Sequence, residues 1–133
     1  MDSVLITGAS RGIGRAIAVE LAARGHRVIA TARDPETLAG LPVDQRLRLD
    51  VTDHDTVDQA IRQAGEIDVL VSNAGATVRA PLESVPLPEV DQLFQLNTLG
   101  ALRVAQAVLP AMRERGAGRL VFVSSSRAAW CSR

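Results

Sequence analysis

The 133-residue chain contains no lysine and no tyrosine, and it has a single cysteine. Its 15 basic residues are all arginines and are balanced by 15 acidic residues, so the formal net charge is zero. A neutral chain offers no overall attraction to nucleic acid or to an anionic membrane. The lone Cys131 cannot form a disulfide within the chain, which is typical of a reducing compartment. These absences predict a soluble cytoplasmic protein that binds neither nucleic acid nor membrane.

Metal-binding and membrane-spanning patterns are also missing. His26 and His54 stand alone among polar neighbours, and no histidine or cysteine grouping has the spacing of a metal site. No apolar run reaches the roughly 18 residues of a membrane span, and the first residues, MDSVLITG, enter a strand pattern instead of a signal peptide. With 47% hydrophobic residues and no low-complexity tract, the chain has the composition of one globular domain over residues 1–133. We expect no metal site.

Apolar runs alternate with helical patterns along the chain. Ile13, Ile17 and Leu21, for example, recur at the four-residue spacing of one helical face. Continuous apolar strands joined by helical crossovers indicate a parallel sheet covered on both faces, the doubly wound or Rossmann-like α/β fold. We expect five strands in the order 3-2-1-4-5. The predicted strands are 4–7, 27–32, 46–51, 67–72 and 119–124, and the predicted helices are 12–24, a short one from Pro35 capped by Asp34, one capped by Thr52 that runs to about Ala64, and 87–115.

The segment TGASRGIG (residues 7–14) lies between the first predicted strand and the first predicted helix. Ser10 occupies its middle position, so the segment is not the G-x-G-x-x-G fingerprint of many dinucleotide sites. Gly8 permits a tight turn, Gly14 lets the helix pack closely on the strand, and Gly12 opens the helix N-terminus. Free backbone N–H groups and the helix dipole at that terminus attract a pyrophosphate. A purely structural turn is the alternative interpretation.

Four motifs occur in the order and at the spacing of one protein family. They are T-G-x-x-x-G-x-G at the first turn, N-A-G after the fourth strand, an asparagine in the next long helix and a serine after the fifth strand. On these motifs the chain resembles the short-chain dehydrogenase/reductase family over essentially its whole length. The resemblance implies a nicotinamide dinucleotide cofactor, and hydride transfer between that cofactor and a small-molecule carbonyl or alcohol. It also implies a family sheet of seven strands, of which this chain would hold five. The cofactor-binding residues that it implies are Gly8, Ser10, Arg11, Gly12, Ile13, Gly14, Arg33, Asp50, Val51, Asn73, Ala74 and Gly75.

Two arginines near the expected adenosine ribose favour NADP over NAD as the cofactor. An acid at the end of the second strand favours NAD, because it hydrogen-bonds the ribose 2′-hydroxyl. This strand ends in T-A-R-D, with Arg33 before Asp34, and Arg11 of the glycine loop can reach the same region. Guanidinium groups match a phosphate with forked donors, and in the family basic residues at these two places imply NADP. Two solvated arginines are the alternative interpretation, and Asp34, although a candidate helix cap, is an argument for NAD.

Asn97 and Ser125 are the candidate catalytic residues. From the residues alone, Asn97 shares a helical row with Val108 and Met112, where a hydrogen-bonded core amide is the simpler interpretation. Ser125 belongs to a run of three serines after the fifth strand, where a turn serine is the simpler interpretation. The resemblance implies instead that the backbone of Asn97 helps to hold a water in a proton relay. It also implies that the Ser125 hydroxyl hydrogen-bonds the substrate oxygen.

The family's Y-x-x-x-K motif, which the resemblance places about a dozen residues after the serine, is not in this sequence. In the family the tyrosine donates a proton to the nascent alkoxide, and general acid catalysis of this kind is typically worth ~10²–10⁴-fold. We expect a C-terminally truncated family member that binds the dinucleotide and turns over little or not at all, so whether it acts as an enzyme stays open. An inactive nucleotide-binding fragment and a repurposed interaction scaffold are the alternatives. An open sheet edge at the fifth strand also predicts self-association.

Overall fold

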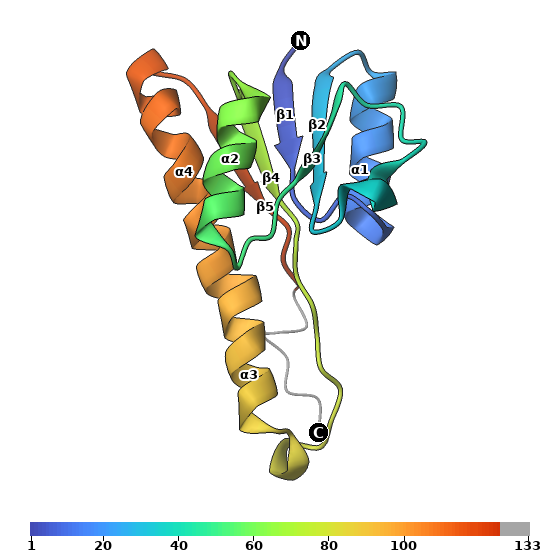
Figure 1. The fold of residues 1–133 in the computed structure, drawn as a ribbon, viewed down its shortest axis with the longest axis vertical. Helices are drawn as coiled ribbons and strands as arrows, with labels where there is room; N and C mark the ends of the chain where they lie inside the picture. The colour runs from blue at the N-terminus through green and yellow to red at the C-terminus, as the bar shows by residue number, and fades with distance from the viewer. Residues whose placement is uncertain (126–133) are drawn as a thin grey trace.

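The computed structural model describes residues 1–125, and Cys131 therefore lies outside the described part of the chain. Five parallel strands form one sheet in the order β3-β2-β1-β4-β5, with helices on both faces (Figure 1). The predicted fold class and strand order are confirmed. The elements are β1 (Ser3–Ile6), α1 (Gly12–Ala23), β2 (Arg27–Ala32), η1 (Pro35–Leu38), β3 (Gln45–Arg48), α2 (His54–Ala64), β4 (Val69–Ser72), η2 (Leu82–Ser84), α3 (Leu87–Phe94), η3 (Gln95–Leu99), α4 (Gly100–Arg115) and β5 (Arg119–Phe122).

The strand β1 lies at the centre of the sheet, between β2 and β4. Its register sets Val4 beside Val28 of β2 and Val69 of β4. These three strands are buried along most of their length, which is why they have nearly continuous apolar sequences. The edge strands β3 and β5 are more exposed, and in β3 the half-buried Gln45 and Leu47 alternate with the exposed Arg46 and Arg48. Sequence pattern and position in the sheet therefore agree.

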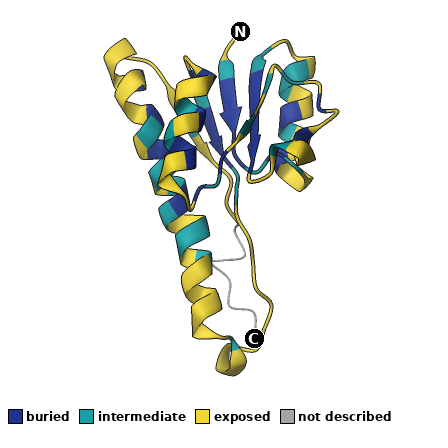
Figure 2. Ribbon diagram, viewed as in Figure 1, coloured by how far each residue is buried: buried dark blue, intermediate teal, exposed yellow. Residues whose placement is uncertain are grey.

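Two separate cores lie on the two faces of the sheet, because successive strand residues point to opposite sides. The helix α1 and the short η1 cover one face, whereas α2 and α4 cover the other (Figure 1). Figure 2 shows the buried residues gathered in the central strands and on the helix faces that meet them. The α1 core includes Val4, Ile6, Ala18, Val28, Ala30, Leu38, Leu41 and Val71. The α2–α4 core includes Leu5, Ile29, Val57, Ala60, Leu70, Val104, Val108 and Met112.

The junction between β3 and α2 differs from its prediction in two ways. Asp53, and not Thr52, caps α2, since the Asp53 carboxylate accepts backbone N–H groups of the first helical turn. Thr52 donates its own N–H and hydroxyl to the Asp50 carboxylate at 2.9 and 2.7 Å. The strand β3 ends at Arg48 instead of residue 51. The Asp50 N–H donates to the Thr56 hydroxyl (3.0 Å) and so does not continue the hydrogen-bond ladder of the sheet. The segment after β3 is therefore a tight, side-chain-stabilised turn.

The predicted helix over residues 87–115 is one helical rod whose middle, η3, is π-helical. A π-helical turn holds more residues than an α-helical turn, so it rotates the face that the following residues present. Val108 and Met112 of the predicted row are buried, but Asn97 is exposed. The prediction that Asn97 lies on the buried row is wrong, because no residue of α3 or η3 is buried and this part of the rod extends beyond the sheet (Figures 1 and 2).

The outer strand β5 presents exposed apolar side chains. Phe122 is 53% exposed, and Val121 and the following Val123 are also exposed. Within residues 1–125, no helix is long and apolar enough to cross a membrane. The same residues contain no group of three or more His, Cys, Asp or Glu side chains that could hold a metal ion.

Candidate functional site

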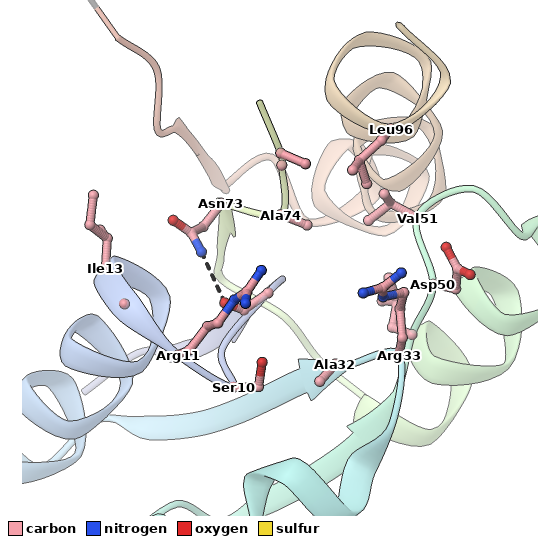
Figure 3. A pocket seen from close by; sticks show the side chains of 15 residues that line it. Ser10, Arg11, Ile13, Ala32, Arg33, Asp50, Val51, Asn73, Ala74 and Leu96 are labelled. Atoms are coloured by element: carbon pink, nitrogen blue, oxygen red, sulfur yellow. Dashed lines mark hydrogen bonds between the residues drawn. The ribbon is translucent and has the colours of Figure 1, made fainter. Parts of the chain in front are cut away.

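A cavity of about 360 Å³ opens at the carboxyl ends of β1, β2 and β4 and at the turn that follows β3 (Figure 3). The order of the strands reverses at the gap between β1 and β4, with β2 and β3 on one side of β1 and β4 and β5 on the other. Open α/β sheets bind ligands at such a switch point. Its volume is within the range of small-molecule sites. The lining residues are Gly8, Ser10, Arg11, Gly12, Ile13, Ala32, Arg33, Leu49, Asp50, Val51, Asn73, Ala74, Gly75, Ala76 and Leu96.

The glycine turn forms the floor of the cavity. Gly8 and Gly12 have φ values of +65° and +59°, a backbone conformation that side chains other than glycine rarely adopt. A Cβ at Gly8 would lie 2.9 Å from the Ala74 Cα, so the turn and the β4 loop approach closely only because Gly8 lacks a side chain. The N-cap residue of α1, Arg11, does not cap the helix with its side chain. The first-turn N–H groups of α1 can therefore donate to an anion in the cavity.

Gly14 is the one predicted glycine that does not line the cavity. It lies buried behind the turn, where a Cβ would be 2.3 Å from the Gly8 carbonyl oxygen and 2.4 Å from Asn73 Nδ2. Gly14 thus shapes the site through packing. Ile13 shares its helical spacing with Ile17 and Leu21, and the resemblance implies that it binds the cofactor; in the structure it is 62% exposed and lines the cavity. Ile13 belongs to the first turn of α1, whereas Ile17 and Leu21 further along the helix are partly buried against the core of that face.

Thr7 and Asn73 join the two sides of the cavity floor. The buried Thr7 hydroxyl accepts the backbone N–H groups of Asn73 (2.9 Å) and Ala74 (3.0 Å). The Asn73 amide donates in return to the carbonyls of Thr7 (3.2 Å) and Gly8 (3.0 Å), the latter inside the view of Figure 3. Four hydrogen bonds between residues 65 to 67 positions apart fix the glycine turn against the end of β4.

Two exposed arginines enter the cavity from different elements, Arg11 from the glycine turn and Arg33 from the end of β2 (Figure 3). Within residues 1–125 neither guanidinium makes a hydrogen bond or an ion pair, so both retain donors for a ligand. Asp34 does not line the cavity. Its carboxylate caps η1 by accepting the Glu36 N–H at 3.0 Å, as the sequence predicts. Two cationic side chains therefore enter the cavity, and the Asp34 carboxylate does not.

The Asp50 carboxyl is held in its ionised form. Partial burial acts to raise its pKa, but hydrogen bonds from the Thr52 hydroxyl and N–H and the charges of Arg33 and Arg48 outweigh burial and lower the pKa below its usual value. Asp50 and Val51 both line the cavity. Asp50 is therefore a fixed negative charge beside Arg33.

Asn97 and Ser125 lie outside the set of cavity-lining residues. The Asn97 side chain makes a reciprocal pair with the backbone of Ala76: it accepts the Ala76 N–H at 2.9 Å and donates to the Ala76 carbonyl at 2.8 Å. Since Ala76 lines the cavity, Asn97 holds one of its walls from the π-helical segment. Ser125 is exposed just beyond β5.

Sequence reasoning missed four lining residues and one contact behind the lining. Each missed lining residue is apolar and stands next in sequence to a predicted site residue, and this adjacency is the only sequence signal for it. The four residues are Ala32, Leu49, Ala76 and Leu96. The Arg103 guanidinium, which donates to the Val51 carbonyl from α4, has no sequence signal.

The site can hold an elongated anionic ligand, with helix N–H donors at one point and two guanidiniums further along.

The family model for short chain dehydrogenase matches residues 2–130. The chain belongs to the short-chain dehydrogenase family. Retinol dehydrogenase 8 of Bos taurus is 42% identical over 137 residues, which cover 92% of this chain and 44% of that protein. A short-chain dehydrogenase from Streptomyces avermitilis has a crystal structure with a TM-score of 0.85 and 41% identity, over 93% of this chain and 49% of that one.

The solved structure of ElxO with NADP bound is also similar, with a TM-score of 0.87 and 27% identity over 99% of this chain and 59% of that one. The family assignment accounts for the parallel sheet, the glycine turn and the N-A-G segment together. The chain spans about half the length of the relatives that it matches.

Proposed function

We propose that this chain binds NADP(H) as the nucleotide-binding part of a short-chain dehydrogenase that transfers hydride between the cofactor and a carbonyl or alcohol. The observation that carries the NADP preference is the pair Arg11 and Arg33 in the cavity, together with the use of Asp34 as a helix cap. A 2′-phosphate gains charge-assisted hydrogen bonds from guanidiniums, whereas a free 2′-hydroxyl would lack an acid at the end of β2 to recognise it, since Asp34 does not line the cavity.

The residues of the cavity fit a dinucleotide in three places. The open N-terminus of α1 at Gly12 has room for a pyrophosphate, since a Cβ there would meet nothing within 4 Å. Arg11 and Arg33 suit the 2′-phosphate, and the turn at Asp50 and Val51 suits the adenine. When bound, the nicotinamide would supply or accept the hydride. The ElxO structure with NADP bound supports this assignment at the level of the shared fold.

Two further roles concern Asn97 and Ser125, the candidate catalytic residues. Asn97 would act by holding Ala76, so that the wall next to the reacting end stays fixed. The Ser125 hydroxyl would hydrogen-bond the oxygen of the carbonyl or alcohol substrate. Hydride transfer also needs a proton donor for that oxygen, and the 133 residues include no tyrosine or lysine to serve as one in the family's manner.

Calorimetric titration of the purified chain with NADPH and NADH tests the cofactor proposal. We expect tighter binding of NADPH, and we expect Arg33→Ala and Arg11→Ala each to weaken NADPH by roughly 10-fold or more, because a hydrogen bond to a charged group contributes about 1.5–3 kcal/mol. NADH binding should change little in these variants. Arg62→Ala, an exposed arginine in the last turn of α2, is the matched control. Equal binding of the two cofactors by the unaltered chain would refute the preference.

A further inference from the structure

The turn after β3 forms one wall of the cavity and is held from behind by two helices. Leu49, Asp50 and Val51 of this turn line the cavity. From α2, the Thr56 hydroxyl accepts the Asp50 N–H and contacts the Asp50 carbonyl, both at 3.0 Å. From α4, the Arg103 guanidinium donates to the Val51 carbonyl. The backbone that faces the ligand is thus fixed by side chains that lie outside the cavity.

Gly100 is the reason that α4 can reach this turn. A Cβ at Gly100 would lie 2.5 Å from Val51 Cγ2, so the first turn of α4 packs directly on the Val51 side chain. Arg103 follows three residues later and therefore lies on the same side of the helix. Its guanidinium is half-buried, and the bond to Val51 is the one hydrogen bond that it makes within residues 1–125.

The Val51 carbonyl depends on this bond. Val51 is only 4% exposed, and a buried carbonyl requires a hydrogen-bond partner. Thr56 fixes Asp50, but no side chain of α2 bonds to the carbonyl of Val51. Without the guanidinium, the turn would retain its link to α2 and lose its link to α4. The position of Val51 in the cavity wall would then no longer be determined from the α4 side.

This turn also adjoins Arg33, one of the two arginines that suit a 2′-phosphate. The charge of Arg33 acts on the Asp50 carboxylate, and both side chains line the same cavity (Figure 3). The end of β2 and the end of β3 are joined by the Leu49 N–H, which donates to the Ala32 carbonyl at 2.9 Å. A ligand group held by Arg33 therefore lies next to the turn that Arg103 supports.

We propose that Arg103 is a positioning residue for the adenosine half of the dinucleotide, which it serves by holding the Val51 carbonyl and so fixing the wall of the cavity next to the adenine. The inference rests on the proposed function. Arg103 does not line the cavity, so it acts through Val51 and not by contact with the ligand.

Fragments of the cofactor allow a test that does not depend on turnover. Arg103→Met keeps the length of the side chain and removes its donors, and Arg103→Lys restores one charged donor. Arg113→Met is the control, because Arg113 is an exposed arginine near the end of the same helix whose side chain has no hydrogen bond within residues 1–125. Calorimetry with adenosine 2′,5′-bisphosphate and with nicotinamide mononucleotide reports the two halves separately. Hydrogen exchange of residues 49–52 in the ligand-free chain reports the turn itself.

Arg103→Met should weaken adenosine 2′,5′-bisphosphate roughly 3- to 30-fold, the range found for residues that act on a site without touching the ligand. Nicotinamide mononucleotide should bind as before, Arg103→Lys should recover part of the loss, and exchange in the turn should be faster. Unchanged affinity for the bisphosphate, or an equal loss for both fragments, would overturn the proposal. If Arg103→Met does not fold, Arg103→Lys carries the same comparison with an intermediate loss expected.

The two proposals fail in different ways. If the unaltered chain binds neither fragment nor NADPH, the proposed function is refuted. The exchange measurement then still decides whether Arg103 holds the turn, and exchange of residues 49–52 that is equal in Arg103→Met and Arg113→Met would refute that role as well.

Discussion

Replacing Gly14 by alanine would place one methyl group where α1, the glycine turn and the end of β4 meet. The added Cβ would lie 2.3 Å from the Gly8 carbonyl oxygen and 2.4 Å from Asn73 Nδ2, whereas ordinary van der Waals contact begins at 3.4 Å. Gly14 has ordinary helical geometry, so alanine brings no backbone strain of its own. The cost comes from the neighbours that must move.

The magnitude follows from those neighbours. Overpacking of a buried site typically costs about 1–3 kcal/mol. If Asn73 turns away, its two hydrogen bonds to the backbone of Thr7 and Gly8 are lost, at about 1 kcal/mol each. Alanine returns about 1 kcal/mol through its higher helix propensity. We therefore expect Gly14→Ala to lower the free energy of unfolding by about 2–4 kcal/mol, which is a large part of the ~5–15 kcal/mol of a typical domain.

Urea unfolding followed by circular dichroism measures this change, and NADPH titration of the same variant measures the cavity. Binding should weaken as well, because Gly8 and Asn73 both line the cavity. Ala16→Gly is the calibration variant, since Ala16 is an exposed position of the same helix and isolates the propensity contribution. A Gly14→Ala chain that is as stable as the unaltered chain, or more stable, would show that the close approach at Gly14 is not a constraint.

Four further outcomes follow from the site. Thr7→Val should destabilise the chain by about 2 kcal/mol or more in urea unfolding, because the N–H groups of Asn73 and Ala74 lose their shared acceptor, and Thr7→Ser should restore stability. The lowered pKa of Asp50 means that its charge stabilises the folded state above the ordinary carboxyl pKa and that this contribution is lost as the pH falls through the folded-state value. The stability gap between the unaltered chain and Asp50→Asn should therefore narrow below about pH 4, in acid unfolding curves followed for both. With NADPH and a panel of aldehydes, ketones and quinones, the 133-residue chain should show little loss of cofactor absorbance, and steady turnover would contradict this expectation. On size-exclusion chromatography the chain should associate through its exposed β5 edge, and a monomer that is stable to dilution would count against it.

The central strands could be predicted from their local pattern, and the strand order followed from assigning the Rossmann-like fold. The apolar runs of β1, β2 and β4 are those of strands buried on both faces, and glycine at the end of β1 marks the turn into α1. Most residues of the cavity follow from the same logic, because they stand directly after a strand, where the carboxyl edge of a parallel sheet lies. Asp34 as a cap is a local feature of a few residues and was predictable for that reason.

The failures involve interactions between distant segments. The π-helical turn around Asn97 is a one-residue change of phase, and a 3.6-residue pattern cannot reveal it when small and apolar residues lie on both sides. Threonine and aspartate are both common helix N-cap residues, so the sequence alone cannot choose between Thr52 and Asp53. Asp53 caps α2 because the N–H and hydroxyl of Thr52 already donate to the Asp50 carboxylate. Arg103 resembles any other arginine of an exposed helix until the approach of α4 to Val51 is known.

The bonds between Thr7 and Asn73 set an order of events during synthesis of the chain. Their partners are 66 residues apart, whereas β1 meets β2 across 24 residues. At ~5–20 residues per second, a ribosome needs roughly 3–13 s to add the intervening stretch. During that interval β1 can pair with β2, but the glycine turn has no opposite side, since Ala74 and Gly75 have not been made. Affinity for the nucleotide should therefore arise late, and a nascent chain released before residue 74 should fail to be retained on an immobilised NADP analogue even though its first two strands are complete.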